Sequence, residues 1–169
     1  MADIATRVGL LEDRAALHDL VARYFLAADG DDIEGLRACF AADASFAIAG
    51  WIGGSGREGI VDFLVDQRRR MGLTLHTPSS VLIAVDGDRA TGLIGAQLEM
   101  VIDGVTVFGA VRYRDTYVRE DDDWRIAARD MRTVHLAPWG EVGEAMASAT
   151  PVRWPGAPPA ASDFPRAGA

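Results

Sequence analysis

An aspartate and a histidine, far apart in the chain, are the first two residues that could do chemistry together. The stretch "RYFLAADGDDIEGL", residues 23–36, places Asp29 at the end of an apolar helical segment. The negative end of the helix dipole disfavours a carboxylate there. Asp29 also lies one turn after Phe25, at the margin of the apolar stripe, so its side chain is expected to point partly inward. An inward carboxylate in this field needs a partner such as an arginine or a protonatable histidine.

His76 is the natural partner to consider. It lies within "LTLHTPSS", and the two-residue period of a strand puts Leu73 and Leu75 on the opposite face. An imidazole whose second nitrogen is held by a carboxylate can act as a general base. The pattern alone leaves the structural alternatives open, namely an exposed loop aspartate and a histidine satisfied within a core.

Two further polar side chains lie on faces that are otherwise partly apolar. Arg129 shares the odd-numbered face of a predicted strand with Met131 and Thr133. It could form a simple salt bridge or face a ligand. Tyr24 lies on the apolar stripe of the first helix, where it could be core, although a buried hydroxyl would need a partner.

The elements that must position these residues follow from periodicity. Apolar residues at helical spacing predict a helix over residues 10–28. Asp31 followed by Glu34 is typical of a capping box and predicts a second, short helix. A strand, "ASFAIAGW", is expected next, and then a Gly-rich turn with Ser55 as the N-cap of a third helix with Glu58 at N3.

From Gly72 onward the pattern predicts four long strands separated by "DGD", "DG" and "EDDD", which are good hairpin turns. Helices followed by a meander indicate an α+β domain, with the helices covering one face of a curled, mainly antiparallel sheet. Polar residues on the inner face predict a pocket rather than a solid core. We expect this domain to span residues 1–137, followed by a Pro- and Gly-rich tail over 138–169 in which no helix or strand is required.

Composition narrows the function classes. The chain has 169 residues, a formal net charge of -8 and a pI of about 4.8. Such an acidic protein is a poor partner for nucleic acid or an anionic membrane, because phosphate contacts need clustered Lys and Arg. Cys39 is the only cysteine, so no intrachain disulfide is possible, and it is expected in the core. No signal peptide or membrane-spanning run is evident, so a cytoplasmic location is expected.

Several familiar motifs are absent. "GGSGREG" lacks the Lys-Ser/Thr ending of a P-loop, and there is no HExxH, no G-x-S-x-G and no Rossmann fingerprint. One cysteine and three scattered histidines do not make a convincing zinc site. We therefore expect neither a metal nor an organic cofactor.

Three segments together resemble a known family. "RAALHDLVARYFLAADGDDIEGLRACFAADASF", "LTLHTPSSVLI" and "DDWRIAARDM" are similar to the SnoaL-like branch of the nuclear-transport-factor-2-like superfamily, over roughly residues 8–137. The resemblance implies a cone-shaped α+β barrel that encloses a pocket. It is a weak guide to the reaction, because this fold hosts isomerases, cyclases, hydrolases, dehydratases and binding modules.

The resemblance also implies roles for individual residues. Lyases of this branch use an aspartate at the end of the first helix and a histidine on the following long strand, which match Asp29 and His76. Arg129 matches an arginine on the last strand that could stabilise a departing group, and Tyr24 matches a tyrosine that could donate a hydrogen bond to substrate. We expect substrate contacts from four further residues, Glu99, Met131, Phe25 and Trp51.

The resulting hypothesis is a cofactor-independent lyase that acts on a hydrophobic cyclic or aromatic small molecule. An isomerase or polyketide-type cyclase, a carbon–carbon lyase that releases an aldehyde, and a non-catalytic binding module remain alternatives. The resemblance further implies a homotrimer. The tail, with Trp139 and Trp154, is expected to bury these rings against a neighbouring subunit or at the pocket mouth.

Overall fold

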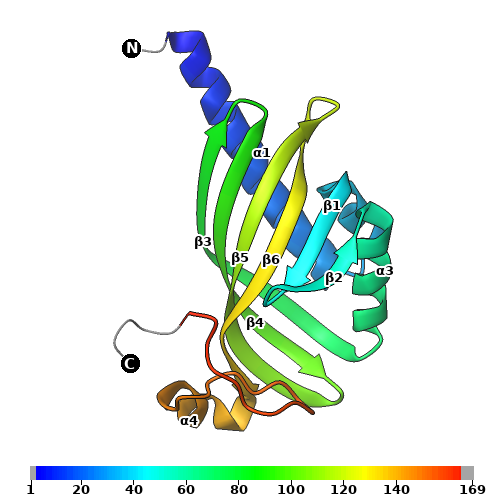
Figure 1. Cartoon of the computed structure of the whole chain (residues 1–169), viewed down its shortest axis with the longest axis vertical. Helices are drawn as coiled ribbons and strands as arrows, with labels where there is room; N and C mark the ends of the chain where they lie inside the picture. Colours follow the sequence, from blue (N-terminus) through cyan, green and yellow to red (C-terminus); the bar gives the residue numbers. More distant parts are fainter. Residues whose placement is uncertain (1–2, 165–169) are drawn as a thin grey trace.

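The computed structural model describes residues 3–164, except for the side chain of Trp51. Within this range the helices come first and a strand meander follows, which confirms the α+β class (Figure 1). The helices are α1 (Ile4–Asp29), α2 (Ile33–Cys39), α3 (Arg57–Arg68) and α4 (Val142–Ala147), with a 3-10 helix η1 (Trp139–Glu141) before α4. The strands are β1 (Phe40–Ile48), β2 (Trp51–Ser55), β3 (Met71–Asp86), β4 (Arg89–Ile102), β5 (Val105–Glu120) and β6 (Asp123–Pro138).

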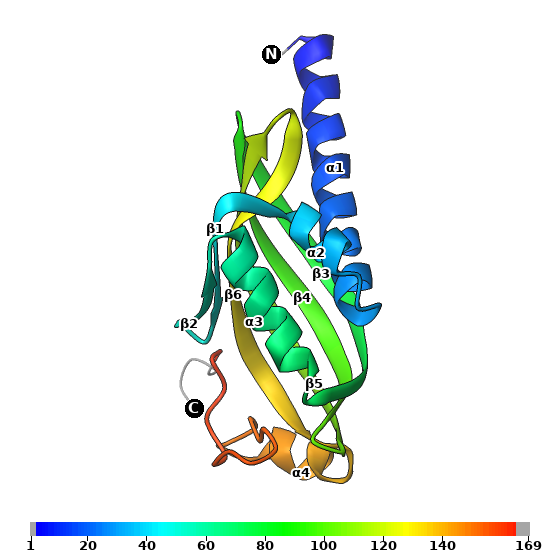
Figure 2. The ribbon, with the colours of Figure 1, turned by 90° about the vertical axis from the view of Figure 1, so that its right-hand side faces the viewer.

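The strands form one curled, open sheet in the order β2-β1-β6-β5-β4-β3. Neighbours β3 to β6 are antiparallel hairpin partners, whereas β1 joins β6 in parallel. Helices α1, α2 and α3 lie along one side of this sheet (Figure 2). The face of the sheet that they cover is therefore the inner face, and the functional side chains must come from it.

The first helix is longer than the periodicity predicts. It begins at Ile4, because the carboxylate of Asp3 accepts a hydrogen bond from the backbone N–H of Thr6 at 2.7 Å. Its buried residues begin only at Leu17, and Figure 1 shows the N-terminal part of α1 projecting beyond the sheet. The packed half ends at Asp29 and carries that residue to β3. None of the described helices is long and apolar enough to cross a membrane.

Both predicted caps of the following helices are displaced by one residue. Asp32, not Asp31, caps α2 and accepts a hydrogen bond from the N–H of Gly35 at 2.9 Å. Asp31 instead adopts a left-handed conformation with φ of 56°, which aspartate tolerates better than most residues. Ser55 ends β2, and α3 begins after Gly56, whose φ of 71° suits glycine. No side chain caps α3.

The sequence predicts a Gly-rich turn where the structure has strand β2, because "GG" is typical of turns. The two glycines serve close packing instead. A Cβ atom on Gly54 would lie only 2.7 Å from the Cα atom of Ile60, and one on Gly53 would meet the ring of Phe63 at 2.7 Å. Glycine within a strand often marks such a close backbone approach. These residues therefore let α3 lie directly on the sheet and face the cavity.

A β-bulge sets which residues of β6 face inward. Ile126 and Ala128 pair with consecutive residues of β5, so Ala127 has no partner of its own. An extra residue of this kind shifts the pleat by one position. The buried residues consequently change from the even-numbered Ile126 to the odd-numbered Arg129 and Met131.

The tail packs against its own chain and is more ordered than the sequence predicts. It forms η1 and α4, and Val152 then makes a parallel bridge to Leu136 of β6. Further along, Asp163 is joined to Thr133 by two hydrogen bonds of 2.7 and 3.0 Å. The tail between these two contacts is thereby held beside the cavity.

Candidate active site

Asp29 and His76 meet as a hydrogen-bonded pair. The Nδ1 atom of His76 lies 2.6 Å from Oδ1 of Asp29, and the backbone N–H of His76 donates to Oδ2 at 2.8 Å. The side chain of Asp29 is only 16% exposed, and that of His76 is only 13% exposed. A carboxylate accepts from Nδ1–H, which leaves the lone pair on Nε2. No described residue hydrogen-bonds Nε2, and the ring lines a cavity, so this nitrogen is available to a bound molecule.

The ring of His76 is also held from one side. Phe25 stacks on it, with the ring centroids 5.2 Å apart and the planes 18° from parallel. Phe25 itself is buried and does not line the cavity. Its expected contact with substrate is therefore not supported, and Phe25 instead packs against the ring of His76.

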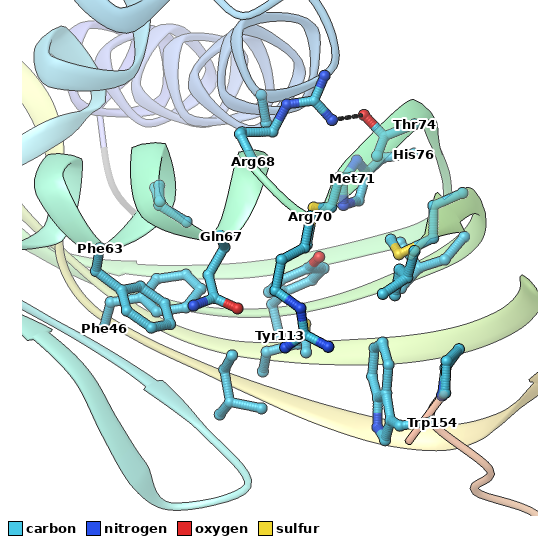
Figure 3. Close-up of a pocket in the computed structure, with 18 of the residues that line it drawn as sticks. Phe46, Phe63, Gln67, Arg68, Arg70, Met71, Thr74, His76, Tyr113 and Trp154 are labelled. Carbon is cyan, nitrogen blue, oxygen red and sulfur yellow. Dashed lines mark hydrogen bonds between the residues drawn. The ribbon is translucent and has the colours of Figure 1, made fainter. Parts of the chain in front are cut away.

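Thr74, two residues before His76 on the same face of β3, completes the surroundings of the carboxylate. It is 6% exposed, and its hydroxyl accepts a hydrogen bond from Arg68 at 3.0 Å (Figure 3). Burial alone would raise the pKa of Asp29. Hydrogen bonds from the His76 ring and backbone, the charge of His76 and a hydrogen bond from Thr74 outweigh this effect and hold that pKa below its ordinary value. Asp29 is therefore a carboxylate at neutral pH.

The cavity beside His76 has a volume of about 490 Å³, within the range of small-molecule sites. Residues from α1, α2, α3, β1, β3, β4, β5, β6 and the tail line it. Its walls are mainly apolar, and Figure 3 shows Phe46, Phe63, Met71 and Trp154 around the space. A cavity of this kind suits a hydrophobic molecule of moderate size.

Two tyrosines lie at the wall of the same cavity. Tyr24 and Tyr113 both line it, and their ring centroids lie 6.5 Å apart. Burial raises the pKa of Tyr24, and it raises the pKa of Tyr113 further, while the charge of Arg129 opposes both shifts in part. Both phenols therefore remain protonated at neutral pH and can act as hydrogen-bond donors.

Arg129 lies behind these tyrosines rather than in the cavity lining. Its guanidinium is fully buried and binds Asp115 through two hydrogen bonds of 2.9 and 2.6 Å. It lies 3.9 Å from the ring centroid of Tyr24 and 4.8 Å from that of Tyr113. Direct contact between Arg129 and a substrate finds no support in this arrangement. A role through the two phenols fits it better.

The other three expected substrate contacts have different outcomes. Met131 is buried and lines the cavity, in agreement with its predicted position. Glu99 does not line it: this side chain is exposed, whereas its neighbours Leu98 and Met100 on β4 point into the cavity. Alternation along the strand places Glu99 on the outer face, so a substrate contact from it is contradicted. The side chain of Trp51 lies outside the described residues.

Sequence reasoning missed several residues of the cavity. Thr74 could have been found, because it lies two residues before His76 and must share its face. Tyr113 carried no such signal, because many side chains of the sheet face inward and nothing local distinguishes this one. The tail residues 154–157 line the cavity as well, and their place depends on docking contacts that no local pattern encodes. Among the described residues, no group of three His, Cys, Asp or Glu side chains could hold a metal ion.

Comparison with solved structures relates the chain to proteins of the same fold. Rv3472, a protein of unknown function from Mycobacterium tuberculosis, is 28% identical with a TM-score of 0.68, over 75% of each chain. Hexachlorocyclohexane dehydrochlorinase LinA-type3 from Novosphingobium barchaimii LL02 is 21% identical with a TM-score of 0.72, covering 78% of this chain and 93% of that one. A scytalone dehydratase-like protein from Novosphingobium aromaticivorans DSM 12444 is 23% identical with a TM-score of 0.71, covering 79% and 91%.

At these low identities the two enzyme-related structures establish the fold alone. No curated protein sequence matches the chain. The SnoaL-like domain family, however, matches residues 10–130, which is well over half of the chain and includes both Asp29 and His76. The cone-shaped α+β fold and the family match agree with the resemblance inferred from the sequence. The chain therefore belongs to the SnoaL-like family.

Proposed function

We propose that this protein is a lyase that eliminates water or another small leaving group from a hydrophobic cyclic or aromatic molecule. One observation carries the proposal: the imidazole of His76 is oriented by Asp29 and lines a largely apolar cavity of about 490 Å³. A base, an orienting carboxylate and a cavity for an apolar molecule are what a proton abstraction next to a breaking bond requires.

In the proposed reaction, Nε2 of His76 takes a proton from a carbon of the substrate. The electron pair of that C–H bond forms a carbon–carbon double bond, and the leaving group departs from the adjacent carbon with its own electron pair. The imidazolium that forms is stabilised by the carboxylate of Asp29, 2.6 Å from Nδ1. The dyad supplies the base without a cofactor.

Tyr24 and Tyr113 are the candidates for stabilising the negative charge that develops on the leaving group or on a substrate oxygen. Each is a protonated phenol at the cavity wall and could donate a hydrogen bond to a departing oxygen or halide, or to a developing oxyanion. Arg129, behind both rings and paired with Asp115, would act through them by its positive charge. Solved structures of the same fold that carry the names dehydrochlorinase and scytalone dehydratase support this class of reaction.

The catalytic alternatives also begin with a deprotonation by His76, from carbon in an isomerase or cyclase and from a hydroxyl group in a retro-aldol cleavage, and they differ in the product. An isomerase or cyclase would return the proton or close a ring, and a retro-aldol lyase would release an aldehyde. The test is incubation of the purified protein, without added cofactor, with a panel of hydroxylated and halogenated cyclic compounds and aryl-propanoids, followed by mass spectrometry. A product lighter by water or hydrogen halide supports the proposal. A product of unchanged mass indicates isomerisation, two fragments indicate carbon–carbon cleavage, and binding without conversion indicates a binding module.

A further inference from the structure

A glutamine interrupts the apolar face that α3 presents to the cavity. Ile60, Phe63 and Leu64 form this face, and Gln67 occupies the next position at helical spacing. Ile60 is fully buried, and the other three line the cavity. Figure 3 shows the amide of Gln67 pointing into the cavity near Phe46 and Phe63. An apolar residue at this position would continue the stripe, whereas glutamine places a polar amide at the cavity wall.

The side chain of Gln67 has no hydrogen-bond partner among the described residues, although an amide offers two donors and an acceptor. Gln67 is half-buried, so water can reach its amide before a ligand binds. An apolar ligand that displaces this water would leave the amide unpaired at a cost in free energy, which a ligand with a matching group avoids. Gln67 and His76 lie apart in Figure 3, so the group bound by Gln67 would differ from the carbon that faces the base.

The cationic residues of the lining show what charge this group should carry. Arg68 binds both carboxylate oxygens of Asp31, at 2.5 and 3.0 Å. Arg70 binds both oxygens of Asp103, at 3.2 and 2.5 Å. Both cations of the lining are thus already paired with an aspartate. A carboxylate or phosphate on the ligand would have to compete with these pairs, whereas a neutral oxygen needs only the amide.

We propose that Gln67 is a specificity-determining residue that binds a neutral oxygen substituent, a carbonyl or a hydroxyl, on the apolar substrate. This inference builds on the proposed function, because it assumes that the molecule bound in the cavity is the substrate of the lyase. The ligand class it defines is a cyclic molecule with an apolar body, a reactive C–H group at His76 and one neutral oxygen held at α3.

Binding of three bicyclic probes by isothermal titration calorimetry tests this assignment. Tetralin has no oxygen, 2-tetralone has a neutral one, and 1,2,3,4-tetrahydro-2-naphthoate is anionic. Gln67→Leu removes the amide at similar size, and Gln67→Met repeats the comparison if the leucine variant folds poorly. Gln97→Leu is the matched control, because Gln97 is exposed on β4 and does not line the cavity.

We expect the affinity ratio of 2-tetralone to tetralin to fall about three- to tenfold in the Gln67 variants, the scale of one hydrogen bond, and to stay unchanged in Gln97→Leu. We also expect wild type to bind 2-tetralone more tightly than the naphthoate. An unchanged ratio, tighter binding of the anion, or no binding of any probe would overturn the inference. The ratio does not require turnover, so it should also shift in a His76→Ala background. A shifted ratio in a protein without lyase activity would leave the inference standing and reject the proposed function.

Discussion

His76 binds Asp29 twice, through Nδ1 at 2.6 Å and through its own backbone N–H at 2.8 Å. The second bond holds the other carboxylate oxygen against the main chain of β3. The carboxylate therefore cannot turn away from the imidazole that it orients. A helix end and a strand are thus joined at the point where the cavity begins. This double contact makes the pair a single unit, so the predictions for the two residues are linked.

Asp29→Asn should retain the fold and ligand binding and lose turnover by about 100-fold or more, because the amide cannot hold the required tautomer or stabilise the imidazolium. If the pair acts as a unit, the Asp29→Asn/His76→Ala double variant should be barely slower than either single variant. Steady-state kinetics of the four proteins measures this. Losses that multiply across the cycle would show two independent roles.

Thr74→Val should raise the pKa of Asp29, because it removes a hydroxyl that lowers this pKa while it keeps the shape of the side chain. Thr74→Ser should keep the pKa near that of wild type. The carboxyl carbon of Asp29, followed by NMR as the pH is lowered, reports the value directly. Equal pKa values in Thr74→Val and wild type would show that Thr74 only fills space.

Acid should weaken the protein partly through Asp29. The folded state lowers the pKa of this group below its ordinary value of 3.8, so the carboxylate stabilises the fold at higher pH. This contribution is complete above about pH 5 and is lost as the pH falls through the lowered pKa. Urea midpoints at pH 6 and pH 3 should differ less for Asp29→Asn than for wild type. Asp19→Asn, at an exposed site on α1, should behave like wild type; equal pH dependence in all three proteins would contradict the assignment.

Much of this arrangement could be predicted from the sequence. The apolar stripe of α1 and the alternation of β3 placed Asp29 and His76 where they could face inward, because both depend on local periodicity, and the family resemblance then paired them. Gln67, the tail and the placement of Arg129 were not predictable in the same way. The position of Arg129 depends on a bulge at Ala127 and on a buried partner fourteen residues earlier, Asp115. Asp31 reads as a cap in isolation, whereas in the fold it binds Arg68, 37 residues away.

We propose a homo-oligomer, with a trimer expected from the family resemblance, and the outer sheet face is the candidate interface. Leu73 and Leu82 of β3 are 80% and 68% exposed, and Leu82 lies opposite the exposed Leu93 of β4. Contiguous exposed apolar groups, such as the Leu82–Leu93 pair, favour an association surface. Light scattering should give a trimer for wild type and a smaller species for Leu82→Lys. Ile4→Lys, at the exposed end of α1, should leave the mass unchanged.

A monomeric wild type at micromolar concentration would reject that proposal. The tail has a separate expected role, because residues 154–157 line the cavity of the same chain. A protein ending at residue 137 should therefore lose affinity for cavity ligands. Unchanged binding in the truncated protein would show that the tail does not shape the site.

The central claim is that His76 is the base, and turnover of His76→Ala on the best substrate from the panel tests it most directly. Its matched control is His18→Ala, at an exposed position of α1. We predict that His76→Ala lowers the turnover number by about 100-fold or more, the usual contribution of a general base, while His18→Ala stays near wild type. EDTA should leave the wild-type rate unchanged. A His76→Ala protein with near-normal turnover, or a wild-type activity abolished by the chelator, would contradict the account.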